Sequence, residues 1–190
     1  MKVIYTILIL LCGCTNNNTT SILKKSNQIL QIIDNNEEFI EIENNNKPKI
    51  FFTLDPECPL SKSYSRTINL LFRKYEDEVD FYNIFSPIVF SQMKTDNFMK
   101  KYHINIPLII DTNHILINYL DAKITPECFL VDSNLNIIYQ GLIDDWVKAL
   151  GSTRKKIENH YLEQSINDFV NNREIKVKKT NAVGCLIQRQ

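Results

Sequence analysis

From residue 49 onward, short apolar runs alternate with stretches of helical length. The run KIFFTL at residues 49–54 is rich in β-favouring residues and is typical of a buried strand. Residues 59–74 predict a helix, because Pro59 suits the first helical position. The apolar contacts of this helix are expected from Ile68, Leu70, Leu71 and Tyr75. Strands that alternate with helices bury their apolar surfaces against one another, so the sequence predicts an α/β fold.

The alternation continues to residue 170. The predicted strands are residues 79–84, 107–110, 127–131 and 136–139, and the predicted helices are residues 91–102, 114–120 and 157–170. A turn at residues 132–134 joins two of these strands as an antiparallel hairpin. We therefore expect a central mixed β-sheet flanked by helices.

Residues 22–42 allow two interpretations. Ile22, Ile29, Leu30 and Ile33 could line one face of a helix. Alternatively, residues 28–33 and 39–42 could form a hairpin around the Asp/Asn cluster at residues 34–36. We favour the hairpin.

The N-terminus has the features of an export signal. Lys2 is followed by an almost wholly apolar run at residues 3–11, which is too short to span a bilayer as a helix. Residues 11–14 (LCGC) resemble the lipobox of bacterial lipoproteins, in which a Cys after a small residue is lipidated. Cys14 fits that role because it follows Gly13. The alternative is a plain secretory signal.

The resemblance implies a division of the chain. Residues 1–13 are the expected signal peptide, residues 14–27 a flexible tether and residues 28–190 the folded domain, with a C-terminal tail at residues 171–190. The protein is then expected in the cell envelope, lipid-anchored to a bacterial membrane and facing the periplasm or the exterior. Three thiols would remain in the mature domain, at Cys58, Cys128 and Cys185.

Composition excludes some functions. A chain of 190 residues holds about one domain. Lys and Arg together number 22, and Asp and Glu together also number 22. This balance argues against a nucleic-acid-binding protein, because such proteins need an excess of basic residues. His103, His114 and His160 are dispersed, and their spacing indicates no metal site. We expect no cofactor.

Cys58 lies in the segment DPECPLS, between the strand at residues 49–54 and the following helix. The exposed N–H groups and the positive dipole end of a helix favour a thiolate at that place. Asp55 and Glu57 are expected to oppose it. Ser61 stands where a C-x-x-C motif has its second cysteine, so the usual resolving thiol is missing.

Four segments together carry a resemblance to a known family. They are FTLDPECPLSKSY at residues 52–64, ITPECFLVD at residues 124–132, YQGLIDD at residues 139–145 and AVGC at residues 182–185. They resemble the redoxin (peroxiredoxin/thiol-oxidoreductase-like) branch of the thioredoxin superfamily, over about residues 47–187. The resemblance implies a thioredoxin-like fold, with Cys58 at the reactive position and Thr125–Pro126 as the cis-proline pair opposite it.

The sequence departs from the family at two positions. Peroxiredoxins have Thr three residues before the reactive Cys, where this chain has Asp55, which speaks against peroxide reduction. Leu142 occupies a hairpin position that is usually basic in this branch, so an anion contact there is lost.

The two remaining thiols have different settings. Cys185 lies in a short apolar patch, residues 183–187, after a long polar stretch. This pattern indicates that the tail folds back onto the body, where Cys185 could resolve Cys58. Cys128 lies within a predicted strand and is expected to be a buried small hydrophobe. Whether Cys58 pairs with Cys185, with Cys128 or with neither stays open at this point.

The pattern favours a membrane-anchored thiol-disulfide oxidoreductase whose partners are protein or small-molecule thiols and disulfides. One alternative is a binding or structural lipoprotein that has lost catalysis. A weaker alternative is a Sco-like copper-handling protein in which Cys58 and Cys185 hold Cu(I).

Overall fold

The computed structural model describes residues 22–25, 29–33, 38–86, 88 and 91–189. The predicted signal peptide, the predicted lipidation site Cys14 and the predicted turn at residues 34–36 lie outside the described residues. Within the described part of the chain, no helix is both long and apolar enough to cross a membrane.

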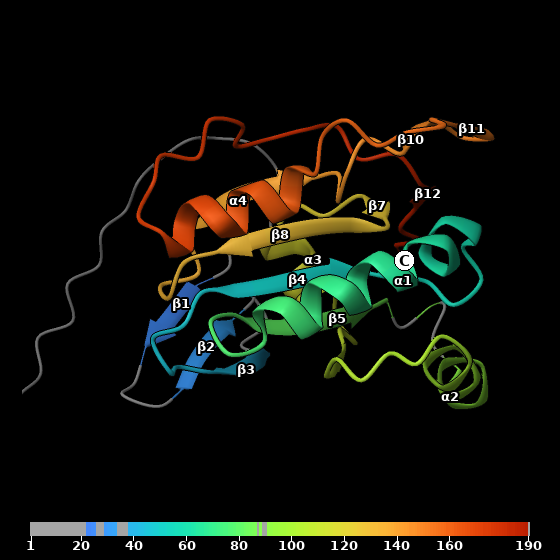
Figure 1. The fold of residues 1–190 in the computed structure, drawn as a ribbon. Helices are drawn as coiled ribbons and strands as arrows, with labels where there is room; N and C mark the ends of the chain where they lie inside the picture. Colours follow the sequence, from blue (N-terminus) through green and yellow to red (C-terminus); the bar gives the residue numbers. More distant parts are fainter. Residues whose placement is uncertain (1–21, 26–28, 34–37, 87, 89–90, 190) are drawn as a thin grey trace, which may run out of the picture.

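A five-stranded sheet forms the centre of the molecule, with the strand order β6-β5-β4-β8-β9 (Figure 1). Its strands are β4 (Lys49–Thr53), β5 (Asp80–Phe85), β6 (Leu108–Ile110), β8 (Glu127–Val131) and β9 (Ile137–Gly141). Strand β4 runs parallel to β5 and antiparallel to β8, and β8 and β9 form the predicted hairpin. The predicted mixed sheet is therefore confirmed.

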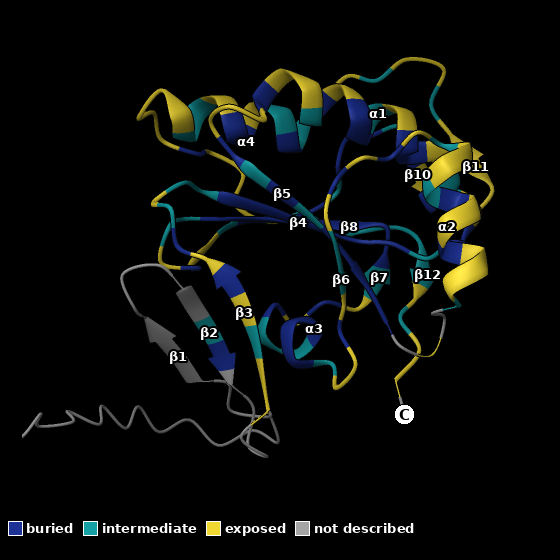
Figure 2. Cartoon of the chain, turned by 90° about the horizontal axis from the view of Figure 1, so that it is seen from below, coloured by how far each residue is buried: buried dark blue, intermediate teal, exposed yellow. Residues whose placement is uncertain are grey.

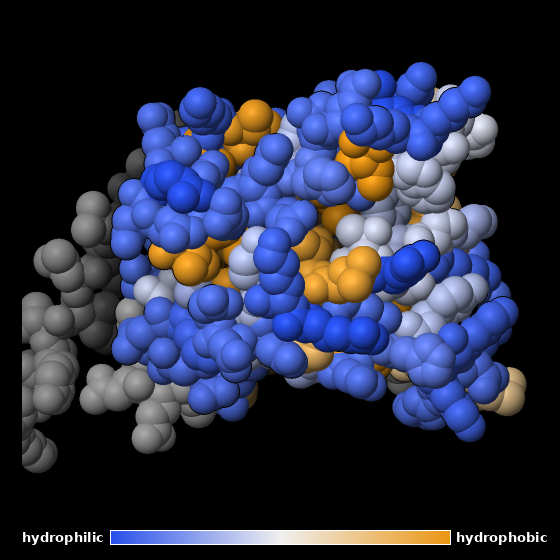
Figure 3. All heavy atoms as spheres, viewed as in Figure 1, coloured by the Kyte–Doolittle hydropathy of each residue, from blue (hydrophilic) through white to orange (hydrophobic). Residues whose placement is uncertain are grey.

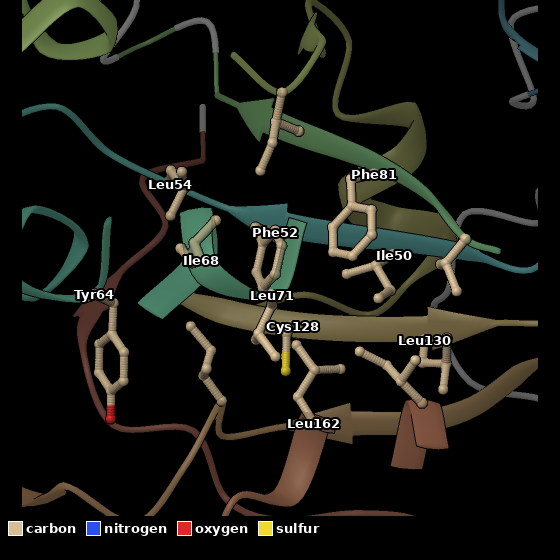
Figure 4. Packing of buried hydrophobic residues seen from close by; sticks show 14 of the residues in the cluster. Ile50, Phe52, Leu54, Tyr64, Ile68, Leu71, Phe81, Cys128, Leu130 and Leu162 are labelled. Atoms are coloured by element: carbon tan, nitrogen blue, oxygen red, sulfur yellow. The ribbon is translucent and has the colours of Figure 1, made fainter. Parts of the chain in front are cut away.

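Helices cover both faces of this sheet, as Figure 2 shows. They are α1 (Pro59–Tyr75), α2 (Gln92–Lys101), α3 (Ile115–Tyr119) and α4 (Tyr161–Val170). Because successive side chains of a strand point to opposite faces, Ile50 and Phe52 pack with residues of α1 and α4, while Phe51 packs with residues of α3. Figure 4 shows the first of these two clusters.

The N-terminal part of the domain is a small antiparallel sheet of β1 (Ile22–Lys25), β2 (Ile29–Ile33) and β3 (Phe39–Glu43). The predicted hairpin is thus confirmed by the pairing of β2 with β3. Strand β1 lies inside the range predicted as a flexible tether, so ordered structure begins by Ile22 rather than at residue 28. Ile32 and Ile42 are buried in the same cluster as α3.

Two pairs of very short strands complete the fold. Strand β10 (Val147–Ala149) pairs with β11 (Ser152–Thr153). Strand β12 (Cys185–Leu186) pairs antiparallel with β7 (Ile124–Thr125), which directly precedes β8. The second pair confirms that the tail folds back onto the body.

Two sequence predictions are wrong in detail. Helix α4 begins at Tyr161 rather than at residue 157, because the Asp145 carboxylate accepts hydrogen bonds from the Glu158 N–H (2.9 Å) and the Asn159 side-chain amide (2.9 Å) and holds this segment outside the helix. Leu70 does not contribute to the core, since it lies on the solvent side of α1 and is 55% exposed.

Candidate functional site

Cys58 lies at the junction between the central sheet and α1. It is the N-cap residue of this helix, in an extended conformation, and Pro59 follows at the first helical position. Its side chain is only 2% exposed. The sequence prediction of a cysteine at a helix start, next to unpaired backbone N–H groups, is therefore confirmed.

The tail brings a second thiol to Cys58. In the pairing of β12 with β7, Cys185 stands opposite Thr125. The Sγ atoms of Cys58 and Cys185 are 2.8 Å apart, and both cysteines are free thiols. Of the two thiols that the sequence offered as neighbours of Cys58, the structure places Cys185 beside it, across 127 positions of the chain.

The peptide bond between Thr125 and Pro126 is cis, and this pair lies directly against the thiols. The Thr125 carbonyl oxygen is 3.3 Å from the Cys58 Sγ and accepts a hydrogen bond from it. Cys58, Cys185, Thr125 and Pro126 thus form one contiguous group, to which we refer as the dithiol site.

Two buried polar residues hold the segment that precedes Pro126. The Thr53 hydroxyl donates to the Ile124 carbonyl (2.6 Å) and accepts from the Glu127 N–H (3.1 Å). The Glu127 carboxylate accepts from the backbone N–H of Lys123 (3.1 Å) and of Ile124 (3.4 Å). The sequence did not predict either role. The contacts of Thr53 are with residues more than 70 positions away, and those of Glu127 cross a turn, so neither leaves a pattern in the sequence.

The two thiols differ in acidity. Burial by itself raises the pKa of Cys58, but hydrogen bonds from the Cys185 thiol and from the backbone N–H groups of Ser61 and Leu60 outweigh it, so the pKa is lowered below 9.0. Burial and the hydrogen bond to Cys58 raise the pKa of Cys185. Of the two thiols, Cys58 therefore loses its proton more readily, and Cys185 holds its proton more tightly.

The acidic neighbours do not oppose the Cys58 thiolate as the sequence suggested. The Glu57 carboxylate is paired with Lys94 at 2.7 Å, on the surface. Asp55 accepts a hydrogen bond from the Glu57 N–H (2.7 Å), and its charge contributes to raising the pKa of Cys185. Ser61, in the place of a second C-x-x-C cysteine, is fully buried and accepts a hydrogen bond from the Asp55 N–H (3.2 Å). It fixes the loop in front of the helix.

Cys128 is not part of the dithiol site. It is completely buried, its sulfur points into the core among the residues that Figure 4 labels, and it contacts the carbonyl oxygens of Gly141 (3.3 Å) and Leu142 (3.4 Å). Burial raises its pKa well above 9.0. The prediction that Cys128 is a core residue is confirmed.

The tail is fixed on both sides of Cys185. Upstream, the Thr180 hydroxyl lies 2.9 Å from the Tyr139 hydroxyl and accepts from the Leu142 N–H (2.8 Å). Gly184 lies so close to the Thr125 carbonyl that any side chain there would collide with it. These contacts place Cys185 over Cys58.

Downstream, the chain end is anchored near the end of β5. The Ser86 hydroxyl is 3.2 Å from the Gln188 carbonyl and 3.0 Å from His114 Nε2. The Arg189 guanidinium donates to the Asn118 side chain (2.7 Å) and to the Ala122 carbonyl (2.5 Å). Nothing in the sequence spacing pointed to these contacts. The histidines remain separate, and among the described residues no three His, Cys, Asp or Glu side chains gather as a metal site.

This architecture, a mixed sheet with a cysteine at a helix start and a cis-proline beside it, is the thioredoxin-like fold. A putative thioredoxin from Neisseria meningitidis matches with a TM-score of 0.56 at 13% identity, over 82% of this chain and 93% of its own. No family model and no curated protein matches the sequence.

Two further solved structures match over more of the chain. A hypothetical protein from Sinorhizobium meliloti 1021 has a TM-score of 0.69 at 16% identity, over 91% of this chain and 99% of its own. An uncharacterized conserved protein from Geobacillus kaustophilus has a TM-score of 0.68 at 16% identity, over 93% of this chain and 98% of its own. At these identities the likeness establishes the fold.

Proposed function

We propose that this protein is a thiol-disulfide oxidoreductase that uses Cys58 as the attacking thiol and Cys185 as the resolving thiol. The observation that carries the proposal is the 2.8 Å contact between the two sulfurs, with the pKa of Cys58 lowered and that of Cys185 raised. A lowered pKa supplies the thiolate that attacks disulfides.

The first step is attack on a partner disulfide. The Cys58 thiolate forms a bond to one partner sulfur, and the partner's own S–S bond breaks. The leaving thiolate takes a proton from solvent, and a mixed disulfide between Cys58 and the partner remains. Since Cys58 is 2% exposed beneath the tail, the tail must move aside for this step.

The second step releases the partner. Cys185 loses its proton and attacks the Cys58 sulfur, which forms the Cys58–Cys185 disulfide and expels the second partner thiolate. Two electrons have then passed from the two cysteines to the partner. An external dithiol of the envelope then reduces the Cys58–Cys185 disulfide. If the protein instead starts with this disulfide formed, the same steps run in reverse and oxidise a partner dithiol.

The experiment follows mixed disulfides on cysteine variants. Cys185→Ser should form a mixed disulfide with a disulfide partner, and this mixed disulfide should persist, because resolution is blocked. Cys58→Ser should form none, and Cys128→Ser, the matched control for a buried thiol, should turn over at the wild-type rate. Mixed disulfides on Cys58→Ser, or unchanged turnover without Cys58, would contradict the proposal.

The redox potential separates this function from that of a binding or structural protein. A permanent staple between Cys58 and Cys185 should have a reduction potential below about −300 mV, whereas a catalytic pair cycles at a higher one. A redox-buffer titration of the full chain, read out by the fraction of linked Cys58 and Cys185 peptides, distinguishes the two.

The location is part of the same proposal. The LCGC motif at residues 11–14 supports lipidation of Cys14 after removal of residues 1–13, which would anchor the protein to a bacterial membrane on the periplasmic or exterior side. Metabolic labelling with a fatty acid should mark the wild type and leave Cys14→Ser unlabelled, while Cys12→Ser stays labelled. A labelled Cys14→Ser protein would contradict the anchor.

A further inference from the structure

The two helices nearest to Cys58 on the solvent side are strongly basic, although the whole chain has no net charge. Helices α1 and α2 together carry seven Lys or Arg residues (four on α1 and three on α2) and a single acid, Asp96. Figure 3 shows that the face that carries α1 is largely hydrophilic, with separate apolar patches. Most of the acidic residues that balance the net charge of the chain therefore lie outside α1 and α2.

Two hollows follow each other along these helices. The first, of about 290 Å³, includes Pro56 and Glu57 of the Cys58 loop, with Lys62 and Lys94 on its sides. The second, of about 450 Å³, includes Arg66 and Arg73 of α1. Lys101 and Tyr102 line both hollows, so the two adjoin. We refer to them together as the furrow, which begins at Pro56 and Glu57, just before Cys58, and follows α1.

The cations of this furrow are mostly unneutralised. Among the ion pairs of the described residues, only the one between Lys94 and Glu57 lies in it. Arg66 and Arg73 are exposed. Lys62 donates to the Glu57 backbone carbonyl at 3.4 Å, and its charge also acts on the Glu57 carboxylate, without a direct ion pair. The furrow has five basic residues and one acidic residue, Glu57, and a concave surface with an excess of one charge concentrates ligands of the opposite sign.

The floor of the furrow is partly apolar. Phe98 lies beneath the first hollow, Leu70 lines the second with 55% of its surface exposed, and the Tyr102 ring lies between them. Apolar contacts on the floor and cations on the rim suit a polypeptide that carries both acidic and apolar side chains. A long, concave shape favours such a segment over the flat surface of a membrane.

We propose that this furrow binds an extended acidic segment of the protein whose disulfide is attacked by Cys58. The proposal rests on the proposed function and adds the class of substrate: proteins with acidic residues close to the reactive disulfide. Since the furrow begins at the Cys58 loop, a segment held in it brings its cysteine to the dithiol site.

The test compares two peptides of equal length on the full chain. Each carries one cysteine in a mixed disulfide with a small thiol; the acidic peptide has Asp and Glu beside the cysteine, and the amide peptide has Asn and Gln instead. At low salt the acidic peptide should form the mixed disulfide with Cys185→Ser about ten times faster or more. This advantage should fall as added salt shortens the Debye length to about 10 Å at 0.1 M.

Charge reversal locates the effect. Arg66→Glu combined with Arg73→Glu should remove the advantage of the acidic peptide and leave the rate with the amide peptide unchanged. Lys47→Glu combined with Lys176→Glu changes the net charge equally outside the furrow and should keep the advantage. Equal rates for the two peptides, or an advantage that survives the furrow reversal, would overturn the proposal.

A binding measurement separates this proposal from the proposed function. Fluorescence anisotropy with Ser in place of the peptide cysteine reports binding without chemistry. Tighter binding of the acidic peptide that is lost on furrow reversal supports the furrow even if Cys58 proves unreactive, and a reactive Cys58 without such binding overturns the furrow alone. Furrow reversal that instead weakens only binding to phosphatidylglycerol vesicles would assign this surface to a membrane and overturn the peptide proposal.

Discussion

At the scale of single residues, the difference in acidity between the two thiols follows from their hydrogen bonds. Cys58 receives hydrogen bonds from the Cys185 thiol and from N–H groups of the first turn of α1, all of which favour its charged form. Cys185 has no comparable set of donors and lies close to the negative charge of Asp55. Identical side chains therefore differ in acidity, with the pKa of Cys58 lowered and that of Cys185 raised.

We expect Cys185→Ala to raise the pKa of Cys58, because the variant loses a hydrogen bond to the thiolate. The absorbance of the thiolate near 240 nm, followed against pH, measures this without requiring access to the buried sulfur. A change of one pKa unit corresponds to about a tenfold change in thiolate population below the pKa. Cys185→Ser keeps a hydroxyl donor and should lie between Cys185→Ala and the wild type. A titration identical in all three would contradict the assigned hydrogen bond.

Glu127 gives a pH dependence of stability. Burial raises the pKa of this carboxyl above 4.5, although the N–H groups of Lys123 and Ile124 partly offset it. Because the folded state then holds the proton more tightly than the unfolded state, the carboxylate costs stability as the pH rises through this range. Glu127→Gln removes that cost, so its free energy of unfolding relative to the wild type should improve from about pH 4 to about pH 8.

Urea unfolding of both proteins at several pH values measures the difference. A matched control is Glu163→Gln, whose carboxylate forms an ion pair with Lys74 at the surface. A difference between Glu127→Gln and the wild type that does not vary with pH would contradict the raised pKa.

At the scale of elements, the short pairing of β12 with β7, two residues from each strand, fixes the position of Cys185. It places Cys185 over Cys58, and its approach depends on Gly184, which has no side chain to collide with the Thr125 carbonyl. The same contact covers the Cys58 thiol, which is 2% exposed. Under the proposed function, both the access of a partner to Cys58 and the attack by Cys185 depend on the position of the tail.

Gly184→Ala should unseat the tail. We expect slower formation of the Cys58–Cys185 disulfide under mild oxidation and faster alkylation of Cys58, each by severalfold, since the thiol is 2% exposed with the tail in place. Mass spectrometry of linked and alkylated peptides measures both. Gly151→Ala is the control. A side chain at this exposed turn meets no atom, and the backbone strain that the φ of +76° imposes lies in the turn between β10 and β11, so neither rate should change. Wild-type rates in Gly184→Ala would contradict the role of the tail.

At the scale of the whole molecule, the sequence predicted the central sheet and helices well, because each carries its own local signal. β4 is a continuous apolar run, and α1 begins at Pro59 and has apolar residues at helical spacing. The position of Cys58 at a strand-to-helix junction and the burial of Cys128 inside a strand were predicted for the same reason.

The rest depended on long-range contacts that leave no local pattern. Strands of two residues such as β7 and β12 have no periodicity to detect, and the position of Cys185 follows from where the tail is fixed. The roles of Thr53 and Ser61 likewise depend on hydrogen bonds to neighbouring segments. The basic furrow could not be predicted from composition, because the chain has 22 basic and 22 acidic residues in total. The furrow arises because the fold gathers several of the basic residues on one surface.

The measurement that tests the central claim most directly is a redox titration of the Cys58–Cys185 pair in the full chain. We predict a reversible two-electron transition at a potential above about −300 mV, in which the linked peptides contain Cys58 and Cys185 and Cys128 stays free. Two thiols that never become linked, a disulfide that involves Cys128, or a bond that cannot be reduced reversibly in this range would contradict the account.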